Sequence, residues 1–225
     1  MKLQAVIFDL DNVLIDSEKL WPEIDQAFFS DYLGKDNWRK WRTVWLAMRK
    51  NTFQLREIMA RLKEMFDKKE SPLEIIDLRM EKMFEVYREK LTLRPGVQEV
   101  LEKLKAENIQ IAIASGMNMK IIKFAVELFG WQDKIAVLAS THEGKKNKPD
   151  PEVFFLAAKR LSVELKNCLV VENELNGVKA GKAAGICTLA VPYPVKQTAE
   201  IKRIADLTIN SLSEFNLDEI KRFLL

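Results

Sequence analysis

The spacing of hydrophobic and polar residues changes twice along the chain. Residues 5–8 are an apolar run in which three of four side chains are β-branched or aromatic, which is typical of a buried strand. Residues 16–91 show helical spacing without strand-like alternation. From Arg94-Pro95-Gly96 onward, short apolar runs alternate with amphipathic segments. The pattern therefore predicts an all-helical segment inserted into an alternating β/α one.

The helical segment separates into four predicted helices. In the second, Trp38, Trp41 and Trp45 recur at i, i+3 and i+7, the spacing of one buried helix face. This spacing favours the core of a small bundle over an aromatic ligand site. The predicted helices span residues 21–32, 37–50, 52–66 and 73–91.

The alternating part predicts a doubly wound parallel α/β sheet of Rossmann-like type, because repeated β-α units make right-handed crossovers. We expect the strand at residues 5–8 to join this sheet. The expected domains are a core of residues 1–15 and 92–225 and a helical cap of residues 16–91. Further strands are predicted at residues 111–114, 135–139, 168–171, 186–191 and 207–209. The buried helix faces are predicted at Val97, Val100, Leu101 and Leu104 and at Ile121, Ile122, Ala125 and Phe129.

Composition narrows the choice of partners. The formal net charge is only +3, from 36 basic and 33 acidic residues, so neither nucleic acid nor a membrane surface is an expected partner. There is no apolar run of the roughly 20 residues that a membrane span needs, and Asp9 interrupts the first run too early for a signal peptide. Cys168 and Cys187 lie in apolar runs, as reduced thiols do, so we expect a cytoplasmic protein. Both a monomer and a homodimer are compatible with the sequence.

The first predicted strand stops at two acids, Asp9 and Asp11. In an open parallel sheet, ligands bind beyond the carboxyl ends of the strands, so both side chains are expected in that crevice. Two acids there can hold a cation or share a reaction. The alternative is that Asp9 caps a turn and Asp11 is solvated.

Polar residues also follow three later strands. Ser115 and Gly116 offer a hydroxyl and backbone N–H groups at a helix start, which suits phosphate; the alternative is that Ser115 is a helix N-cap. Lys148 precedes two prolines that stiffen its loop, although most loop lysines are merely solvated. Glu172 and Asn173 add oxygen ligands, or else they cap the next helix.

In this order the four stretches resemble the haloacid dehalogenase superfamily, in particular its magnesium-dependent phosphatases and β-phosphoglucomutase-like members with a helical cap. The resemblance covers the whole core, and its strength lies in the order of four individually weak motifs. The stretches are Asp9-Leu10-Asp11-Asn12-Val13, Ser115, Lys148-Pro149-Asp150-Pro151 and Glu172-Asn173.

The resemblance implies that Asp9 attacks phosphorus to form an aspartyl-phosphate, while Asp11 protonates the leaving oxygen and then activates water. It implies that Ser115, with Gly116 beside it, and Lys148 hold the phosphoryl group. It also implies that Mg²⁺ is bound by Asp9, the backbone carbonyl of Asp11 and an acid of the fourth motif.

Two positions depart from the family pattern. The usual Gly-Thr is Asn12-Val13 here, but Asn tolerates a left-handed backbone and so permits a tight loop. Asn173 stands where many relatives carry a magnesium-binding Asp. An amide oxygen can still coordinate, and Glu172 can bind the metal directly or through water, with Glu174 as a third candidate.

The expected function is a magnesium-dependent phosphatase of small phosphorylated metabolites. A sugar-phosphate mutase of the same family and a non-catalytic phosphate-binding relative are the alternatives, the latter because of Asn173. Dehalogenation is disfavoured, since a halide leaving group needs no acid at Asp11. A nucleotide-cofactor enzyme is also disfavoured, because Asp9 to Asn12 replace a glycine-rich turn. The lone histidine, His142, is expected to be solvated in a loop.

Overall fold

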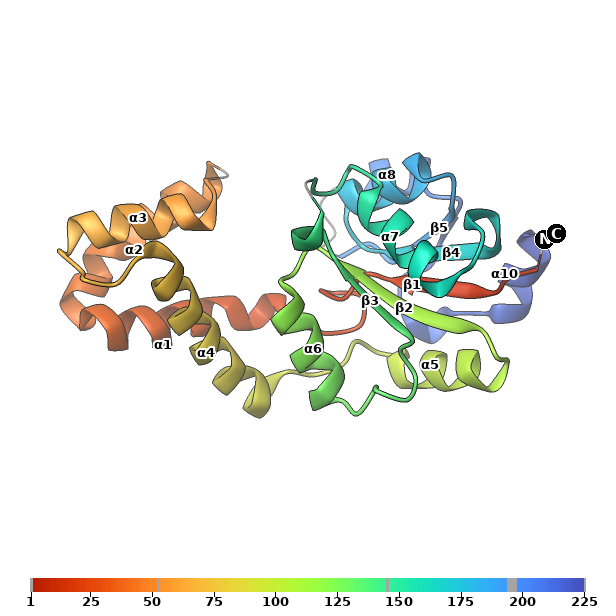
Figure 1. Ribbon diagram of the computed structural model, residues 1–225, viewed down its shortest axis with the longest axis horizontal. Helices are drawn as coiled ribbons and strands as arrows, with labels where there is room; N and C mark the ends of the chain where they lie inside the picture. Colours follow the sequence, from red (N-terminus) through yellow and green to blue (C-terminus); the bar gives the residue numbers. More distant parts are fainter. Residues whose placement is uncertain (1, 52, 145, 194–197, 225) are drawn as a thin grey trace. The chain divides into compact units, whose positions relative to one another are not determined.

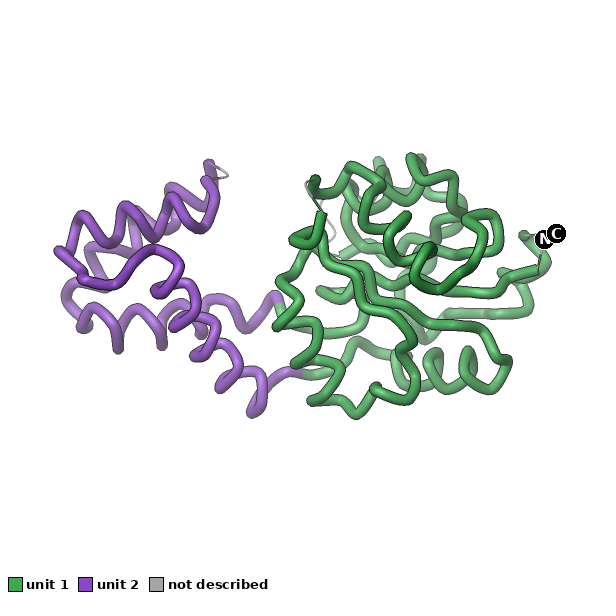
Figure 2. The backbone as a smooth tube through the Cα atoms, viewed as in Figure 1, with its two compact units in different colours: residues 1–17, 92–225 green, residues 18–91 purple. Residues whose placement is uncertain are grey.

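The computed structural model describes residues 2–51, 53–144, 146–193 and 198–224. The chain divides into two compact units, one of residues 1–17 and 92–225 and the other of residues 18–91 (Figure 2). This division lies two residues beyond the expected one. Asp16 stays with the first unit because its main-chain N–H donates to the carbonyl of Thr92 at 2.9 Å.

The first unit is built on a six-stranded, wholly parallel sheet in the order β3-β2-β1-β4-β5-β6. The chain runs outward from β1 to β3 and then returns to β4, so the strand order reverses between β1 and β4. That reversal is the topological switch point at which such sheets bind ligands. The strands are β1 (Ala5–Phe8), β2 (Gln110–Ser115), β3 (Val137–Ser140), β4 (Cys168–Glu172), β5 (Cys187–Ala190) and β6 (Leu207–Thr208).

Helices cover both faces of this sheet, as the buried, continuously apolar central strands require (Figure 1). Helices α5 and α6 lie on one face and α7 and α8 on the other. The first unit contains α5 (Val97–Ala106), α6 (Met119–Leu128), α7 (Glu152–Leu161), α8 (Leu175–Ala183), α9 (Thr198–Ile204) and α10 (Leu217–Phe223), with 3-10 turns at Thr141–Glu143, Leu165–Asn167 and Leu212–Glu214.

The helix faces agree with the hydrophobic pattern in α5 and differ in part in α6. All four predicted positions of α5 are buried. In α6, Ile122 and Ala125 are buried, whereas Ile121 and Phe129 are half-buried and Val126 takes a core position. The predicted stripe of α6 was therefore displaced by about one residue, because every residue from Ile121 to Val126 except Lys123 is apolar and the pattern does not fix the helix rotation.

The second unit is a four-helix module with an aromatic core. Trp41 is fully buried and Trp38 and Trp45 are almost so, which confirms the tryptophan stripe as bundle core. The ring of Phe29 lies 5.0 Å from Trp38 and 5.1 Å from Trp45, measured between centroids. The predicted start of the third helix at Thr52 lies outside the described residues. After the 3-10 turn Glu18–Leu20, the helices are α1 (Trp21–Leu33), α2 (Lys35–Lys50), α3 (Leu55–Met65) and α4 (Pro72–Lys90).

A buried ion pair joins three helices of this unit. Arg79 of α4 contacts Asp25 of α1, with Nη2 and Oδ1 2.5 Å apart, and the same carboxylate accepts from Nε1 of Trp45 in α2 at 2.9 Å. The Arg79 guanidinium also lies over the Trp45 ring. The unit thus has its own core and its own polar cross-link. None of the helices in the described ranges has the length and apolar character needed to cross a bilayer.

Candidate active site

Three neighbouring strands place polar side chains at one edge of the sheet. Asp9 follows β1, and its main-chain N–H continues the ladder by donating to Val171 at 3.0 Å. Ser115 is the last residue of β2 and Glu172 the last of β4. Because β1 pairs with both β2 and β4, the three side chains are neighbours at the switch point. This is the edge at which the sequence predicted them.

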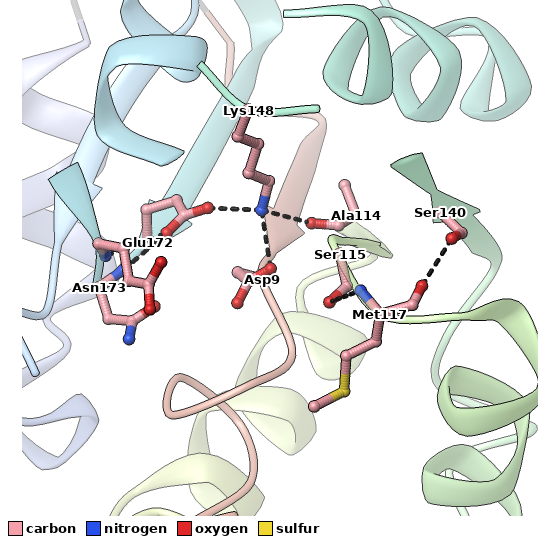
Figure 3. Close-up of polar contacts among 9 residues, drawn as sticks. Asp9, Ala114, Ser115, Met117, Ser140, Lys148, Glu172 and Asn173 are labelled. Atoms are coloured by element: carbon pink, nitrogen blue, oxygen red, sulfur yellow. Dashed lines mark hydrogen bonds and ion pairs between the residues drawn. The ribbon is translucent and has the colours of Figure 1, made fainter. Parts of the chain in front are cut away.

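Lys148 reaches this edge from the loop after β3 and contacts two acids (Figure 3). Its Nζ donates to Asp9 Oδ1 at 2.7 Å, to Glu172 Oε1 at 2.6 Å and to the carbonyl of Ala114 at 3.0 Å. These three contacts use all the donors of the ammonium group. Only 11% of the Lys148 side chain is exposed, so the alternative of a solvated loop lysine is wrong.

Burial and the neighbouring opposite charges set the protonation of Glu172 and Lys148. Burial raises the pKa of the Glu172 carboxyl to about 7, against the opposing effect of the Lys148 ammonium. Burial also disfavours the charged form of Lys148, yet the negative charges of Asp9 and Glu172 outweigh it and raise its pKa well above the ordinary value. Lys148 therefore stays an ammonium, and it holds one fixed positive charge against Asp9.

The loop after Asp9 is tight. Asn12 adopts the left-handed conformation with φ of 58°, as the sequence permitted, and its N–H donates to Ile15 at 2.8 Å. Asp11 Oδ1 accepts a hydrogen bond from the hydroxyl of Ser17. Ser17 is completely buried, and the sequence analysis did not identify it as a site residue. Its hydroxyl fixes the direction of the Asp11 carboxylate.

The loop after β2 is organised by two serines. Ser115 is buried, and its Oγ accepts from the N–H of Met117 at 3.2 Å. The alternative that Ser115 is a helix N-cap is wrong, because Asn118 caps α6 by accepting from Lys120 at 2.9 Å. Ser140, which sequence analysis missed, donates to the Met117 carbonyl at 2.6 Å. The register of β2 with β3 brings it there.

Residues 3–185 match the model of the family described as "Hydrolase: haloacid dehalogenase-like hydrolase", which covers most of the chain. The chain belongs to the haloacid dehalogenase-like hydrolases. The expected family and the expected class of enzyme are thereby confirmed, and so is the Rossmann-like α/β core.

Curated relatives of this haloacid dehalogenase-like hydrolase include several named phosphatases. Hexitol phosphatase B of Escherichia coli is 27% identical over 97% of both chains. The phosphorylated carbohydrates phosphatase of Thermotoga maritima is 33% identical over 82% of both chains. The bifunctional riboflavin kinase/FMN phosphatase of Arabidopsis thaliana is 36% identical over 61% of this chain, but the match spans only 36% of that protein.

Solved structures show the same fold. The β-phosphoglucomutase of Clostridium difficile superposes with a TM-score of 0.72 at 23% identity, covering 100% of this chain and 97% of the other. At this identity the likeness concerns the fold alone.

In this haloacid dehalogenase-like hydrolase, the side-chain oxygen of Asn173 is suited to binding a divalent cation. The Asn173 side chain is buried, and its Nδ2 donates to the carbonyl of Tyr193 at 3.0 Å. Its Oδ1 has no hydrogen-bond partner in the described part of the chain. Leaving a buried carbonyl oxygen without a partner costs free energy, and a cation removes that cost.

The donor set suits magnesium better than a softer metal. In the described ranges, no three His, Cys, Asp or Glu side chains gather as a ready metal cluster. Magnesium needs only one or two carboxylates and takes its other ligands from water, carbonyl oxygens and phosphate. Asp9, the carbonyl of Asp11 and Asn173, which the family resemblance implies as ligands, are oxygen donors of this kind. Glu172 is engaged by Lys148, and Glu174 is exposed.

Glu172 also contacts the main chain at the start of α8, as the helix-capping alternative for this position expected. Its Oε2 accepts from the N–H groups of Asn173 at 2.9 Å and Glu174 at 3.3 Å. A Cβ atom built on Gly177, in the first turn of α8, would lie 1.9 Å from Glu172 Oε1. Only glycine leaves room for this carboxylate.

His142 is exposed, as expected for a solvated loop histidine.

We expect Gly177→Ala to displace the Glu172 carboxylate and thereby loosen Lys148. The added methyl overlaps the carboxylate, and overpacking of this kind typically costs about 1–3 kcal/mol. Urea unfolding measures the loss of stability. The control is Asn176→Ala, at an exposed position of the same turn, which we expect to change stability by less than about 0.5 kcal/mol. Equal stability of both variants contradicts the steric argument.

Proposed function

We propose that this protein is a magnesium-dependent phosphatase that hydrolyses small phosphorylated metabolites, with Asp9 as the nucleophile. The observation that carries the proposal is the buried ammonium of Lys148, held 2.7 Å from Asp9 and 2.6 Å from Glu172. A carboxylate that attacks a phosphate dianion approaches a like charge, so it needs fixed positive charge beside it.

The proposed reaction has two steps. In the first, an oxygen of Asp9 forms a bond to phosphorus while the bond to the ester oxygen breaks, and Asp11 gives that oxygen its proton. In the second, Asp11 takes a proton from water, the water oxygen bonds to phosphorus, and Asp9 is released with inorganic phosphate. When substrate binds, Lys148 exchanges one of its three acceptors for a phosphoryl oxygen, and the Ser115 hydroxyl and the Gly116 N–H hold the other phosphoryl oxygens. A bound Mg²⁺ supplies further positive charge at the phosphate.

Phosphorylated sugars and sugar alcohols are the proposed substrate class. Two relatives that match over most of their length are named for hexitols and phosphorylated carbohydrates, which supports this choice. We assign residues 18–91 the role of a cap that excludes water during the reaction, by resemblance to the family. A sugar-phosphate mutase remains the second candidate, since it starts with the same aspartyl-phosphate.

The test is a hydrolysis assay on p-nitrophenyl phosphate and on a panel of phosphorylated sugars, hexitols and glycolate. We expect phosphate release with Mg²⁺ and its loss after EDTA treatment, restored by added Mg²⁺. Isomerised sugar phosphate without free phosphate would identify the mutase. Magnesium binding without turnover on the whole panel would identify a non-catalytic relative, and hydrolysis that is unaffected by EDTA would contradict the proposed metal.

We expect Asp11→Asn to lower turnover by about 10²- to 10⁴-fold, the usual contribution of a positioned general acid and base. The amide still accepts from Ser17, so the loop keeps its shape. Turnover of p-nitrophenyl phosphate, whose leaving group needs little protonation, should fall less than turnover of a hexitol phosphate. An equal loss on both substrates would argue that Asp11 acts elsewhere than on the leaving oxygen.

A further inference from the structure

The direction of the Asn173 amide depends on one main-chain carbonyl. The carbonyl of Tyr193 accepts from Asn173 Nδ2 at 3.0 Å, and because a carbonyl can only accept, it selects the NH₂ group and leaves Oδ1 on the other side. The N–H of Tyr193 is directed back to the carbonyl of Asn173 at 3.5 Å. Before it, Val191 donates to Glu172 at 2.7 Å. Tyr193 thus continues the edge of β5 beside the fourth motif.

The same pairing favours an amide over a carboxylate at position 173. With Asp at position 173, one carboxylate oxygen would face the Tyr193 carbonyl oxygen at about the 3.0 Å now spanned by a hydrogen bond. Two acceptors at that distance repel each other. Asn173 and the Tyr193 carbonyl are therefore complementary, and the position of Tyr193 matters to the site.

The Tyr193 ring is held by an arginine from a distant segment. The Arg94 guanidinium carbon lies 4.3 Å from the centroid of the ring, within the range of a cation–π contact. The N–H of Arg94 donates to Leu14 at 3.0 Å, and its Nη1 lies 3.7 Å from Asp16 Oδ1. Arg94 therefore lies on the segment by which the chain returns to the first unit, and it contacts the segment by which the chain leaves that unit.

We propose that Arg94 and Tyr193 are positioning residues that hold the Asn173 amide with Oδ1 presented to the cation. All the contacts that carry this proposal lie within the first unit. The proposal rests on the proposed role of Asn173 in metal binding. It predicts that metal affinity depends on residues that do not touch the metal.

The test measures Mg²⁺ binding without substrate, by calorimetric titration of the whole protein. Loss of a residue that orients a metal ligand typically costs about 10- to 100-fold in affinity. We expect Tyr193→Ala and Arg94→Leu each to weaken Mg²⁺ binding by about tenfold or more. The double variant should be no weaker than Tyr193→Ala, since both act through one contact. The control, Tyr193→Phe, keeps the ring and should bind like the wild type.

A metal-free measurement separates this proposal from the proposed function. The side-chain ¹⁵N–¹H₂ resonances of Asn173 should shift in Arg94→Leu and in Tyr193→Ala, and they should keep their position in Tyr193→Phe. Unchanged resonances together with wild-type Mg²⁺ affinity in Arg94→Leu overturn the positioning role. A wild-type protein that neither binds Mg²⁺ nor hydrolyses phosphate esters overturns the proposed function as well. If Tyr193→Ala does not fold, Arg94→Leu alone decides the matter.

Discussion

In the Asp9→Asn variant, hydrolysis of phosphate esters should fall by at least about 10⁴-fold. Amide oxygen is a poor nucleophile, so the variant cannot form the aspartyl-phosphate on which the proposed two-step reaction depends. The substitution changes little else, because asparagine has nearly the same shape and its Oδ1 can still accept from Lys148. The initial rate of phosphate release, measured with saturating Mg²⁺, checks the expectation.

The matched control for this variant is Asp133→Asn. Asp133 is an exposed acid of the same unit, where it pairs with Lys105 and Lys134. We expect its rate to equal that of the wild type. Brief exposure of the wild type to substrate, followed by acid quenching and mass spectrometry, should reveal a phosphorylated peptide that contains Asp9. Full activity in Asp9→Asn, or a phosphoryl group on another residue, would falsify the proposed mechanism.

Replacing Lys148 with methionine should reduce both stability and activity. The substitution leaves Asp9 and Glu172 buried side by side without their shared cation, and breaking a buried ion pair on one side typically costs about 3–5 kcal/mol. Loss of one group that stabilises charge in the transition state typically costs about 10²- to 10³-fold in rate. Urea unfolding and steady-state hydrolysis measure the two effects.

The loss of stability in Lys148→Met should depend on pH. Burial already raises the pKa of Glu172 to about 7 in the presence of Lys148, and removing the ammonium raises it further. A folded-state pKa above the unfolded one means that the folded protein binds more protons, so stability falls as pH rises from about 4.5 through the folded pKa. We therefore expect the variant to be closest to the wild type near pH 5 and most destabilised above pH 7.

Lys146→Met provides the comparison within the same loop. The Lys146 side chain is 66% exposed and pairs with Asp150 on the surface, so its loss should change stability by less than about 1 kcal/mol and leave the rate unaltered. If Lys146→Met proves as damaging as Lys148→Met, the loop as a whole matters rather than the buried charge.

The parts of this site that lie at strand ends could be predicted from the sequence. Asp9, Ser115 and Glu172 were predictable because each follows a short apolar run, and parallel strands bring such ends to one edge. Lys148 was also predictable once the third motif was seen to follow a strand. The observed strand boundaries differ from the predicted ones by one or two residues. For example, β3 begins at Val137, whereas the prediction began at residue 135.

The missed residues are those whose role depends on tertiary contacts. Ser17, Ser140 and Tyr193 reach the site through hydrogen bonds to Asp11, Met117 and Asn173. Nothing in their local sequence distinguishes them from ordinary loop residues. Gly177 was likewise unremarked, since the need for a missing side chain appears only when the Glu172 carboxylate is placed against it.

The central place of β1 has a consequence for how the chain acquires its structure. Ala5 of β1 pairs with Gln110 of β2 on one side and with Cys168 of β4 on the other. Both neighbours come later in the chain, so during synthesis β1 remains unpaired until those strands have been made. Until they are made, four apolar residues have two open edges, a condition that invites aggregation. Independent folding of residues 18–91 would help, because the bridge between Ile15 and Leu93 brings the ends of that segment together and shortens the loop that β1 and β2 must close.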